Sequence, residues 1–167
     1  MKLKVVSRIL ITLSIISFGS KVFAQTGFTP QKLSGEINTG YAEINPILSP
    51  DGKTLYFTRV NHPENRFGEV DSQDIWCTTL NPDGTWSEAK RLPNTINLGR
   101  YNAIFGILDD GKTFVINGHY TESGKYWTER GLSVIERIDE NTWGTPRPLN
   151  VKGFTRMNKG LTTTAYL

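Results

Sequence analysis

Short segments that alternate between apolar and polar side chains cover most of the chain after its first two dozen residues. Residues 54–59, TLYFTR, alternate in this way and are rich in aromatic and β-branched side chains, which is typical of a β-strand. Asp51-Gly52 precedes this segment and favours a tight hairpin turn, because both residue types tolerate the positive φ angles of such turns. No amphipathic helix is visible in the same region, so we predict an all-β fold. Eight strands are expected, at residues 44–48, 54–59, 74–80, 85–92, 103–108, 113–117, 132–138 and 142–149.

The turn and the strand that follows it occur twice. Residues 49–57, SPDGKTLYF, return as LDDGKTFVI at residues 108–116, an offset of 59 positions. Later in the repeat the offset shortens to 57, which indicates that one connection differs in length while the framework recurs. Repeats of four short strands at this period are typical of β-propeller blades. The matching pairs are Leu33 with Leu92, Ile37 with Ile96, Asn38 with Asn97 and Gly40 with Gly99 at offset 59, and Thr85-Trp86 with Thr142-Trp143 at offset 57.

The repeated motifs resemble a known family. SPDGKTLYFTR, DIW and DGTWSEAKRL are similar to the WD-like propeller repeat of bacterial envelope proteins of the TolB type. The likeness is closest to exported Bacteroidetes-type proteins, in which such a propeller precedes an outer-membrane-protein-A-like domain that binds peptidoglycan. The second copy departs from the pattern, with Leu108-Asp109 in place of Ser49-Pro50 and no aromatic residue at the position of Trp76. No sequence of the peptidoglycan-binding kind accompanies the repeats, so the resemblance implies the propeller fold without that activity.

The phase of the repeat suggests an incomplete ring. Residues 32–38 match the end of a repeat, two full repeats follow, and residues 158–167 begin a third. We therefore expect a propeller fragment with two four-stranded antiparallel blades and one extra strand at each end. Either the chain is a truncated part of a longer protein or several short chains assemble into a ring; the interrupted third repeat favours truncation. The expected segments are 1–24 as a signal peptide, 25–40 with the orphan outer strand, 41–98 as blade 1, 99–155 as blade 2 and 156–167 as the start of a third blade.

The first 24 residues have the three parts of a secretory signal. Lys2, Lys4 and Arg8 form a basic start, residues 9–18 are mostly apolar, and Val22-Phe23-Ala24 offers a cleavage site before Gln25. The apolar run is short for a membrane anchor, and a lipid anchor is disfavoured because no cysteine lies near the cut. We expect an exported protein, periplasmic, associated with the outer membrane or secreted, that has no membrane span after cleavage.

Removal of this segment changes the charge of the protein. It holds four of the 19 lysine and arginine residues and no acidic residue, which leaves 15 basic and 16 acidic residues and a net charge of −1. This balance excludes the basic surface that nucleic-acid binding requires. Cys77, the single cysteine, permits no internal disulfide and is interpreted as a small buried apolar residue.

Motifs of catalysis and of cofactor binding are absent from the sequence. It contains no nucleophile elbow, no paired-histidine zinc motif and no phosphate-binding glycine loop, so we predict neither an enzyme nor a cofactor. Asp71-Ser72-Gln73-Asp74 offers two carboxylates to calcium, but the rest of a calcium loop is missing and a turn explains it better. We predict no metal site.

Recognition is expected on the face of the blades that carries the long connections, residues 60–73 and 118–131. Long loops on a rigid scaffold are frequent binding sites, and aromatic and arginine side chains are enriched at binding hot spots. The hypothesis is a non-catalytic module that binds a protein partner in the cell envelope; ordinary solvated loops are the alternative interpretation. An accessory propeller domain of a prolyl-oligopeptidase-type hydrolase and a sugar-binding lectin formed by oligomerisation remain alternative functions. The candidate binding residues are His62, Arg66, Phe67, Tyr120, Tyr126, Trp127 and Arg130.

Overall fold

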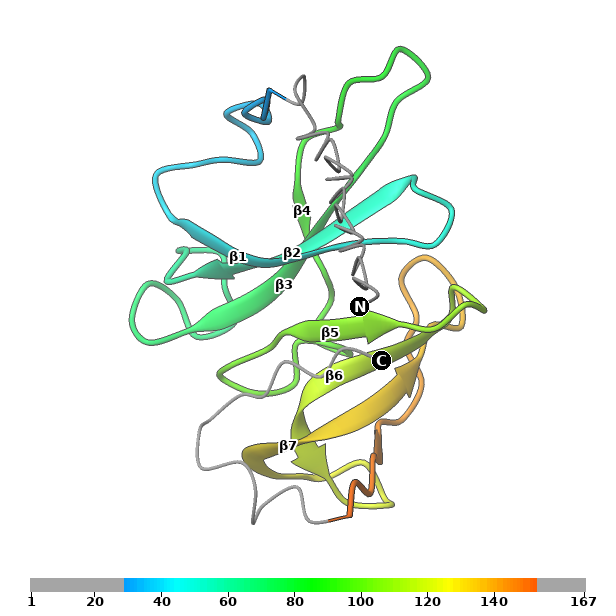
Figure 1. Cartoon of the computed structure of the whole chain (residues 1–167). Coiled ribbons are helices and arrows are strands. Elements are labelled where there is room, and N and C mark those ends of the chain that lie inside the picture. Colours follow the sequence, from blue (N-terminus) through cyan, green and yellow to red (C-terminus); the bar gives the residue numbers. More distant parts are fainter. Residues whose placement is uncertain (1–28, 153–167) are drawn as a thin grey trace, which may run out of the picture. The chain divides into compact units, whose positions relative to one another are not determined.

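The computed structural model of the chain describes residues 29–152, apart from the side chains of residues 127–130 (Figure 1). It contains two four-stranded antiparallel sheets, with strand orders β1-β2-β3-β4 and β5-β6-β7-β8, which both belong to one compact unit. No helix occurs among residues 29–152, so the all-β class is confirmed for this part of the chain. The predicted signal peptide and third blade start lie outside it. The strands are β1 Ala42–Leu48, β2 Thr54–Val60, β3 Gln73–Thr79, β4 Lys90–Arg91, β5 Ile104–Ile107, β6 Thr113–Tyr120, β7 Tyr126–Glu136 and β8 Arg147–Pro148.

The fourth strand of each sheet is much shorter than the sequence predicts. Residues 85–92 and 142–149 were expected to be strands, but only β4 and β8 pair regularly, and Trp86 and Trp143 form isolated bridges to Leu80 and Arg137. In the second sheet, Pro146 and Pro148 lack the N–H that a ladder needs. In the first, Ser87 Oγ accepts a hydrogen bond from the Thr79 N–H at 3.1 Å. The outer edges are therefore short, irregular strands.

The second sheet extends into a region predicted to be a loop. The expected long connection over residues 118–131 is wrong: β6 continues to Tyr120 and β7 starts at Tyr126, joined by a turn in which the Thr121 N–H donates to the Lys125 carbonyl at 2.8 Å. Gly118 and Gly131, with φ of 97° and 148°, lie where the register of β6 and β7 shifts. Glycine at these positions accommodates a β-bulge, where the sequence alone suggested the ends of a loop.

The sequence repeat corresponds to a structural repeat. The Leu92 N–H donates to the Ile75 carbonyl at 2.9 Å, and the Leu149 N–H donates to the Leu132 carbonyl at the same distance. These four residues follow the offset of 57, whereas β1 and β2 follow the offset of 59 to β5 and β6. The change of offset therefore falls in the connection between the second and third strands, which is shorter in the second sheet.

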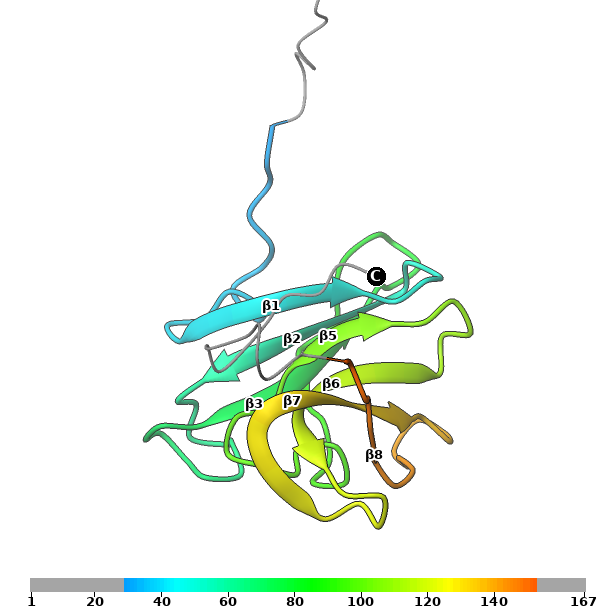
Figure 2. The ribbon, with the colours of Figure 1, turned by 60° about the horizontal axis from the view of Figure 1, so that its bottom comes forward.

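An aromatic core joins the two sheets. Tyr56 of β2 packs edge-on against Phe114 of β6 with ring centroids 5.3 Å apart, and Phe114 packs against Trp143 at 4.8 Å. Ile75 and Ile135 belong to the same cluster, from β3 and β7. Fully burying one large apolar side chain contributes about 1.5–3 kcal/mol, so this cluster is a major source of stability. Strands β1 and β5 lie next to each other where the sheets meet (Figure 2).

Two asparagines hold the linker between the sheets, residues 92–103, against β3. Asn102 Nδ2 donates to Asp74 Oδ1 and to the Gln73 carbonyl, both at 2.9 Å. Asn97 Oδ1 accepts from the Ile75 N–H at 2.7 Å, and its Nδ2 donates to the Leu92 carbonyl at 2.8 Å. Both asparagines are buried, and buried amides stabilise a fold only when they are hydrogen-bonded in this way. This network fixes the path of the linker along β3, and with it the position at which the second sheet begins.

Candidate functional site

The connection between β2 and β3, here called loop 61–72, is braced by its own polar side chains. Asn65 is 5% exposed; its Nδ2 donates to the Arg59 carbonyl at 3.0 Å, and its Oδ1 accepts from Trp76 Nε1 at 3.1 Å. The Ser72 N–H donates to Asn61 Oδ1 at 3.0 Å, and Ser72 Oγ donates to the Gly68 carbonyl. Compact loops packed by their own side chains are frequently functional.

Arg66 and Phe67 lie in this loop, as predicted. The Arg66 N–H donates to Asp74 Oδ2 at 2.6 Å, and its Nη1 donates to the carbonyls of Asn97 and Leu98, both at 2.9 Å. The Arg66 guanidinium lies 5.5 Å from the centroid of the Phe67 ring. Arg66 therefore connects the loop to the linker between the sheets and also contacts the exposed aromatic ring.

Two residues that the sequence did not single out complete this surface. The Arg100 guanidinium lies 4.8 Å from the Phe67 centroid, at a separation typical of cation–π contacts. Phe67 is 43% exposed and Val70 is 76% exposed. The signal for Val70 is an apolar residue between the acidic residues Glu69 and Asp71, whereas nothing in the sequence indicates that Arg100 reaches Phe67. The loop presents apolar and arginine groups together, a combination enriched at binding hot spots.

The His62 side chain supports the loop from within and contributes less to its exposed surface. Its ring packs edge-on between Tyr41 at 4.7 Å and Trp76 at 4.6 Å. Burial, and then the nearby Arg59 charge, lower the pKa of His62, which keeps the ring neutral at pH 7. Its Nδ1 accepts a hydrogen bond from the Glu64 N–H at 3.2 Å, in agreement with a neutral ring.

The remaining predicted site residues belong to the extended hairpin of the second sheet. Tyr120 is 2% exposed, and burial raises its pKa to about 12, so it is a core residue without a surface for a partner. Tyr126 is 38% exposed and packs edge-on against Tyr120 with centroids 5.4 Å apart. Trp127 and Arg130 fall in β7, and their side chains lie outside the described residues.

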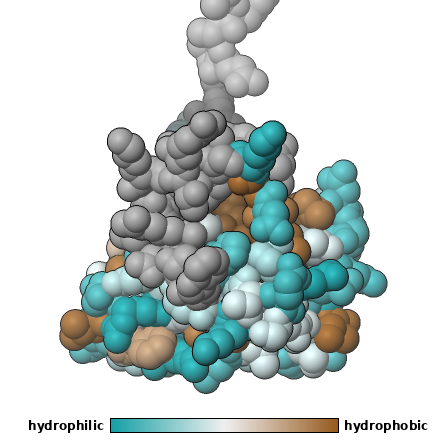
Figure 3. Space-filling view, turned by 90° about the horizontal axis from the view of Figure 1, so that it is seen from below, coloured by the Kyte–Doolittle hydropathy of each residue, from teal (hydrophilic) through white to brown (hydrophobic). Residues whose placement is uncertain are grey.

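The structure brings part of the predicted set together at the linker. Arg66 Nη1 binds the Leu98 carbonyl, and the Tyr126 ring lies against Gly99, within 3.6 Å of where a Cβ would be. Loop 61–72 and the second hairpin therefore approach the same short segment from the two sheets. On the face that Figure 3 shows, hydrophobic residues form separate patches among hydrophilic ones.

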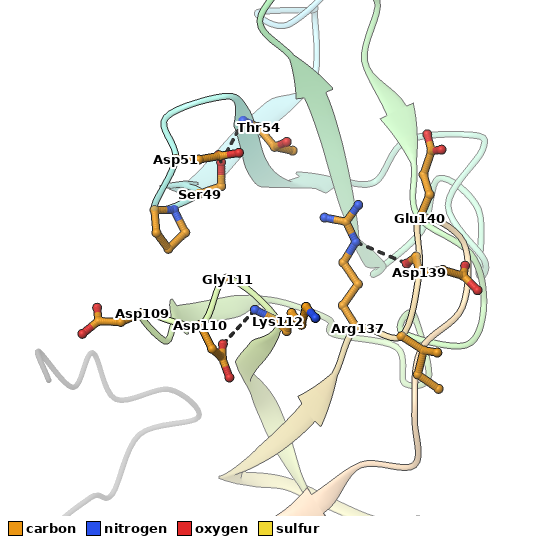
Figure 4. A pocket seen from close by; sticks show the side chains of 12 residues that line it. Ser49, Asp51, Thr54, Asp109, Asp110, Gly111, Lys112, Arg137, Asp139 and Glu140 are labelled. Atoms are coloured by element: carbon orange, nitrogen blue, oxygen red, sulfur yellow. Dashed lines mark hydrogen bonds between the residues drawn. The ribbon is translucent and has the colours of Figure 1, made fainter.

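A cavity lies among the short turns, which the sequence indicates only as hairpin connections. This turn-face cavity has a volume of about 450 Å³ and is lined by the β1–β2, β5–β6 and β7–β8 turns (Figure 4). Arg137 stands among the three turns; its Nη1 donates to Tyr56 Oη at 3.0 Å and its Nε to the Asp139 carbonyl at 3.2 Å. Sequence reasoning missed the cavity because the three turns are far apart along the chain.

Each of the three turns contains an aspartate that is held ionised by hydrogen bonds. The Ser49 hydroxyl and the Lys53 N–H lower the pKa of Asp51, and donors from residues 112–113 and 141–142 lower the pKa values of Asp110 and Asp139. The lining also includes two further acids and two cations, so its formal charge is −3. The complete charged set is Asp51, Asp109, Asp110, Asp139, Glu140, Lys112 and Arg137.

The described residues contain no group of three or more histidine, cysteine or acidic side chains arranged to hold a metal ion. Burial raises the pKa of the half-buried Cys77 thiol, which keeps it protonated and poorly nucleophilic. In the part of the chain that the structure describes, no helix is long and apolar enough to cross a membrane. Comparisons of the chain with protein-family models, curated proteins and solved structures gave no match.

Proposed function

We propose that this chain is part of an exported β-propeller of the TolB-like type, and that it binds a protein partner in the cell envelope through loop 61–72. Two equivalent four-stranded antiparallel sheets, packed against each other through an aromatic core, support the propeller assignment. The signal-like first 24 residues support export. The proposal includes no catalytic role and no cofactor.

The segment before β1 supports a continuing array of sheets. The N–H groups of Ile37 and Asn38 both donate to the Ser34 carbonyl, at 3.1 and 2.9 Å, and those of residues 96 and 97 donate to the Pro93 carbonyl in the same way. Asn38 Nδ2 donates to the Leu33 carbonyl at 2.9 Å, as its repeat mate does to Leu92.

The two segments, residues 33–38 and 92–97, differ in whether a strand of a preceding sheet lies beside them. Asn97 also binds both backbone groups of Ile75 in β3, whereas Asn38 has no such strand beside it among residues 29–152. A preceding sheet at this position would give Asn38 the partner that Asn97 has. This geometry is expected for consecutive sheets of a larger propeller, in which the linker after each sheet binds the third strand of that sheet.

The observation that carries the binding proposal is the braced, exposed tip of loop 61–72. Asn65 and Ser72 fix its backbone, and Phe67 and Val70 are presented to solvent beside two guanidinium groups. A loop that is already ordered loses little conformational entropy on binding. Exposed apolar groups on an ordered tip gain free energy when a partner covers them.

A site-specific photo-crosslinking experiment tests this proposal. A photoreactive amino acid at Val70, 76% exposed, is compared with one at Ile138, 64% exposed in the β7–β8 turn. We expect one crosslinked species of defined mass at Val70, in cells that export the protein, and none of that mass at Ile138. The Phe67→Ser substitution should remove it without changing the circular dichroism spectrum. Equal crosslinking at the two positions, or an unchanged adduct in the Phe67 variant, would exclude loop 61–72 as the contact.

A further inference from the structure

The turn-face cavity contains a fixed positive group with unused hydrogen-bonding capacity. Arg137 is half-buried, and its Nη1 and Nε are held by Tyr56 Oη and the Asp139 carbonyl. Its Nη2 makes no hydrogen bond within the described part of the chain, and neither does the Lys112 ammonium group. Because two of its nitrogens are already held, the guanidinium is oriented before any ligand arrives. Guanidinium groups bind carboxylates through strong charge-assisted hydrogen bonds.

Negative groups surround this positive group. Figure 4 shows Arg137 between the turn that carries Asp51 and the segment that carries Glu140. Asp51 uses one oxygen, Oδ1, for the Ser49 hydroxyl and the Lys53 N–H, and its Oδ2 has no partner among the described residues. Glu140 is exposed and makes no hydrogen bond in the same part of the chain. Both carboxylates are therefore available to a positively charged group.

The arrangement of charge restricts what the cavity can bind. A phosphate-rich or multiply anionic ligand is repelled, since the lining has a formal charge of −3. A simple cation gains from the acidic residues, but Arg137 and Lys112 oppose it inside the cavity. A molecule with one carboxylate and one ammonium group satisfies both kinds of residue at once. The volume of about 450 Å³ is within the usual range of small-ligand sites, about 300–1,000 Å³.

We propose that the turn-face cavity binds a zwitterionic ligand of the free amino acid or short peptide class. Its carboxylate is bound by Arg137 Nη2 with support from Lys112, and its ammonium group by Asp51 Oδ2. The cavity is separate from loop 61–72 and is built from the turns of both sheets. The site therefore goes beyond the proposed protein-binding function and does not depend on it.

Three forms of one dipeptide test the proposal with the full chain. Alanyl-alanine carries both charges, its C-terminal amide only the ammonium group, and its N-acetyl form only the carboxylate. Binding is followed by isothermal titration calorimetry and by the amide shifts of residues 109–112 and 137–140 in NMR spectra. We expect the zwitterion to bind at millimolar concentration, and each capped form to bind at least about tenfold more weakly, since each loses a charge-assisted contact.

Substitutions separate binding from folding. Arg137→Met should abolish binding of the zwitterion, but it also removes the contact with Tyr56, so a lowered stability is to be expected. Lys112→Gln leaves every described side-chain contact in place and should weaken binding about threefold to tenfold. Lys125→Gln, in the turn between β6 and β7, is the matched control and should bind like the unchanged chain.

Each of the following results would overturn the proposal. The first is the absence of calorimetric heat and of localised shifts with the zwitterion when the chain is folded. The second is equal binding of the zwitterion and its capped forms. The third is binding that is unaffected in both Arg137→Met and Lys112→Gln. Because the probes are small molecules, these results are independent of whether a protein partner binds loop 61–72.

Discussion

Asn97 supplies the Ile75 N–H with the hydrogen-bond acceptor that strand pairing does not supply, and it adds a second donor to the Ile75 carbonyl, which also accepts from the Leu92 N–H. Its Oδ1 accepts from the Ile75 N–H at 2.7 Å, and its Nδ2 donates to the Ile75 carbonyl at 3.2 Å. The two residues are 22 positions apart, and Asn97 is completely buried. A side-chain amide here takes the place of a neighbouring strand, just beyond the end of the short β4.

Replacement of Asn97 by alanine should therefore be strongly destabilising. It removes the hydrogen bonds that Asn97 makes to the Ile75 N–H and to the Leu92 carbonyl, and each buried group left without a partner costs about 1–3 kcal/mol. We expect the free energy of unfolding, measured by urea denaturation, to fall by about 2–4 kcal/mol. Asn38→Ala is the matched control. Asn38 Nδ2 donates to the Leu33 carbonyl as Asn97 Nδ2 donates to the Leu92 carbonyl, but only Asn97 also binds β3. An equal loss in both variants would contradict this account.

Gly131 should tolerate no side chain. A Cβ at this position would lie 2.8 Å from the Cβ of His119, and its φ of 148° disfavours other residues. We expect Gly131→Ala to lower the free energy of unfolding by about 2–4 kcal/mol through strain in the bulged β6–β7 hairpin. Gly40→Ala is the control, since nothing lies within 4 Å of the place that a Cβ would take there, and its effect should be below about 0.5 kcal/mol. Similar melting temperatures for the two variants would show that the bulge accepts a side chain.

The ionised turn aspartates should make the protein less stable in acid. The pKa of Asp110 is lowered mainly by the Thr113 hydroxyl and by the N–H groups of residues 112 and 113. A carboxylate whose pKa is lower in the folded state stabilises the fold fully above its unfolded pKa of about 3.9. That contribution is lost as the pH falls through the lower, folded value. The Asp110 carboxyl carbon should titrate in NMR spectra at a pH below its unfolded pKa, and the urea midpoint should drop as the pH falls from that unfolded pKa through the folded one.

The pH dependence has its own control. Asp110→Asn removes the titrating group while keeping an oxygen that accepts from Thr113. This variant should lose part of the acid-dependent change in the urea midpoint. If its midpoint follows the pH as steeply as that of the unchanged chain, the carboxylate does not contribute in the way described.

Cys77 should react slowly with thiol reagents in the folded protein. Burial raises the pKa of its thiol, so that the reactive thiolate is scarce at pH 8 and access is limited. We expect modification by Ellman's reagent to be at least about tenfold faster in denaturing urea than in buffer, since a pKa of about 8.5 is restored on unfolding. Equal rates would mean that the thiol is accessible in the native state.

The first three strands of the first sheet, and the turn between β5 and β6 in the second, were predictable because their signals are local. Asp51-Gly52 and the alternating residues after it specify a hairpin within a dozen positions, and the same pattern recurs at Asp110-Gly111. The fourth strands were overestimated, because Trp86 and Trp143 look like strand residues but form only single bridges. The hydrogen bonds of these segments depend on side chains such as Ser87, which no strand pattern reveals.

The candidate site was predicted in part. His62, Arg66 and Phe67 were correctly placed on one connection, since glycine and polar residues mark its length in the sequence. Tyr120 falls in the predicted connection over residues 118–131, but Gly118 and Gly131 at its two ends lie at shifts in the register of a longer hairpin. A bulge and a loop contain the same residue types, so only pairing with the opposite strand distinguishes them.

The sequence by itself determined that the chain repeats a four-stranded unit, where its hairpins turn and that its charge is balanced after residue 24. Only the tertiary structure decided which polar groups are buried and which turns surround a cavity. Arg137 and Tyr56 are 81 positions apart, and their contact exists only because one sheet packs against the other. Periodicity and turn chemistry act over a few residues, whereas a cavity and a buried amide depend on side chains that packing alone brings together.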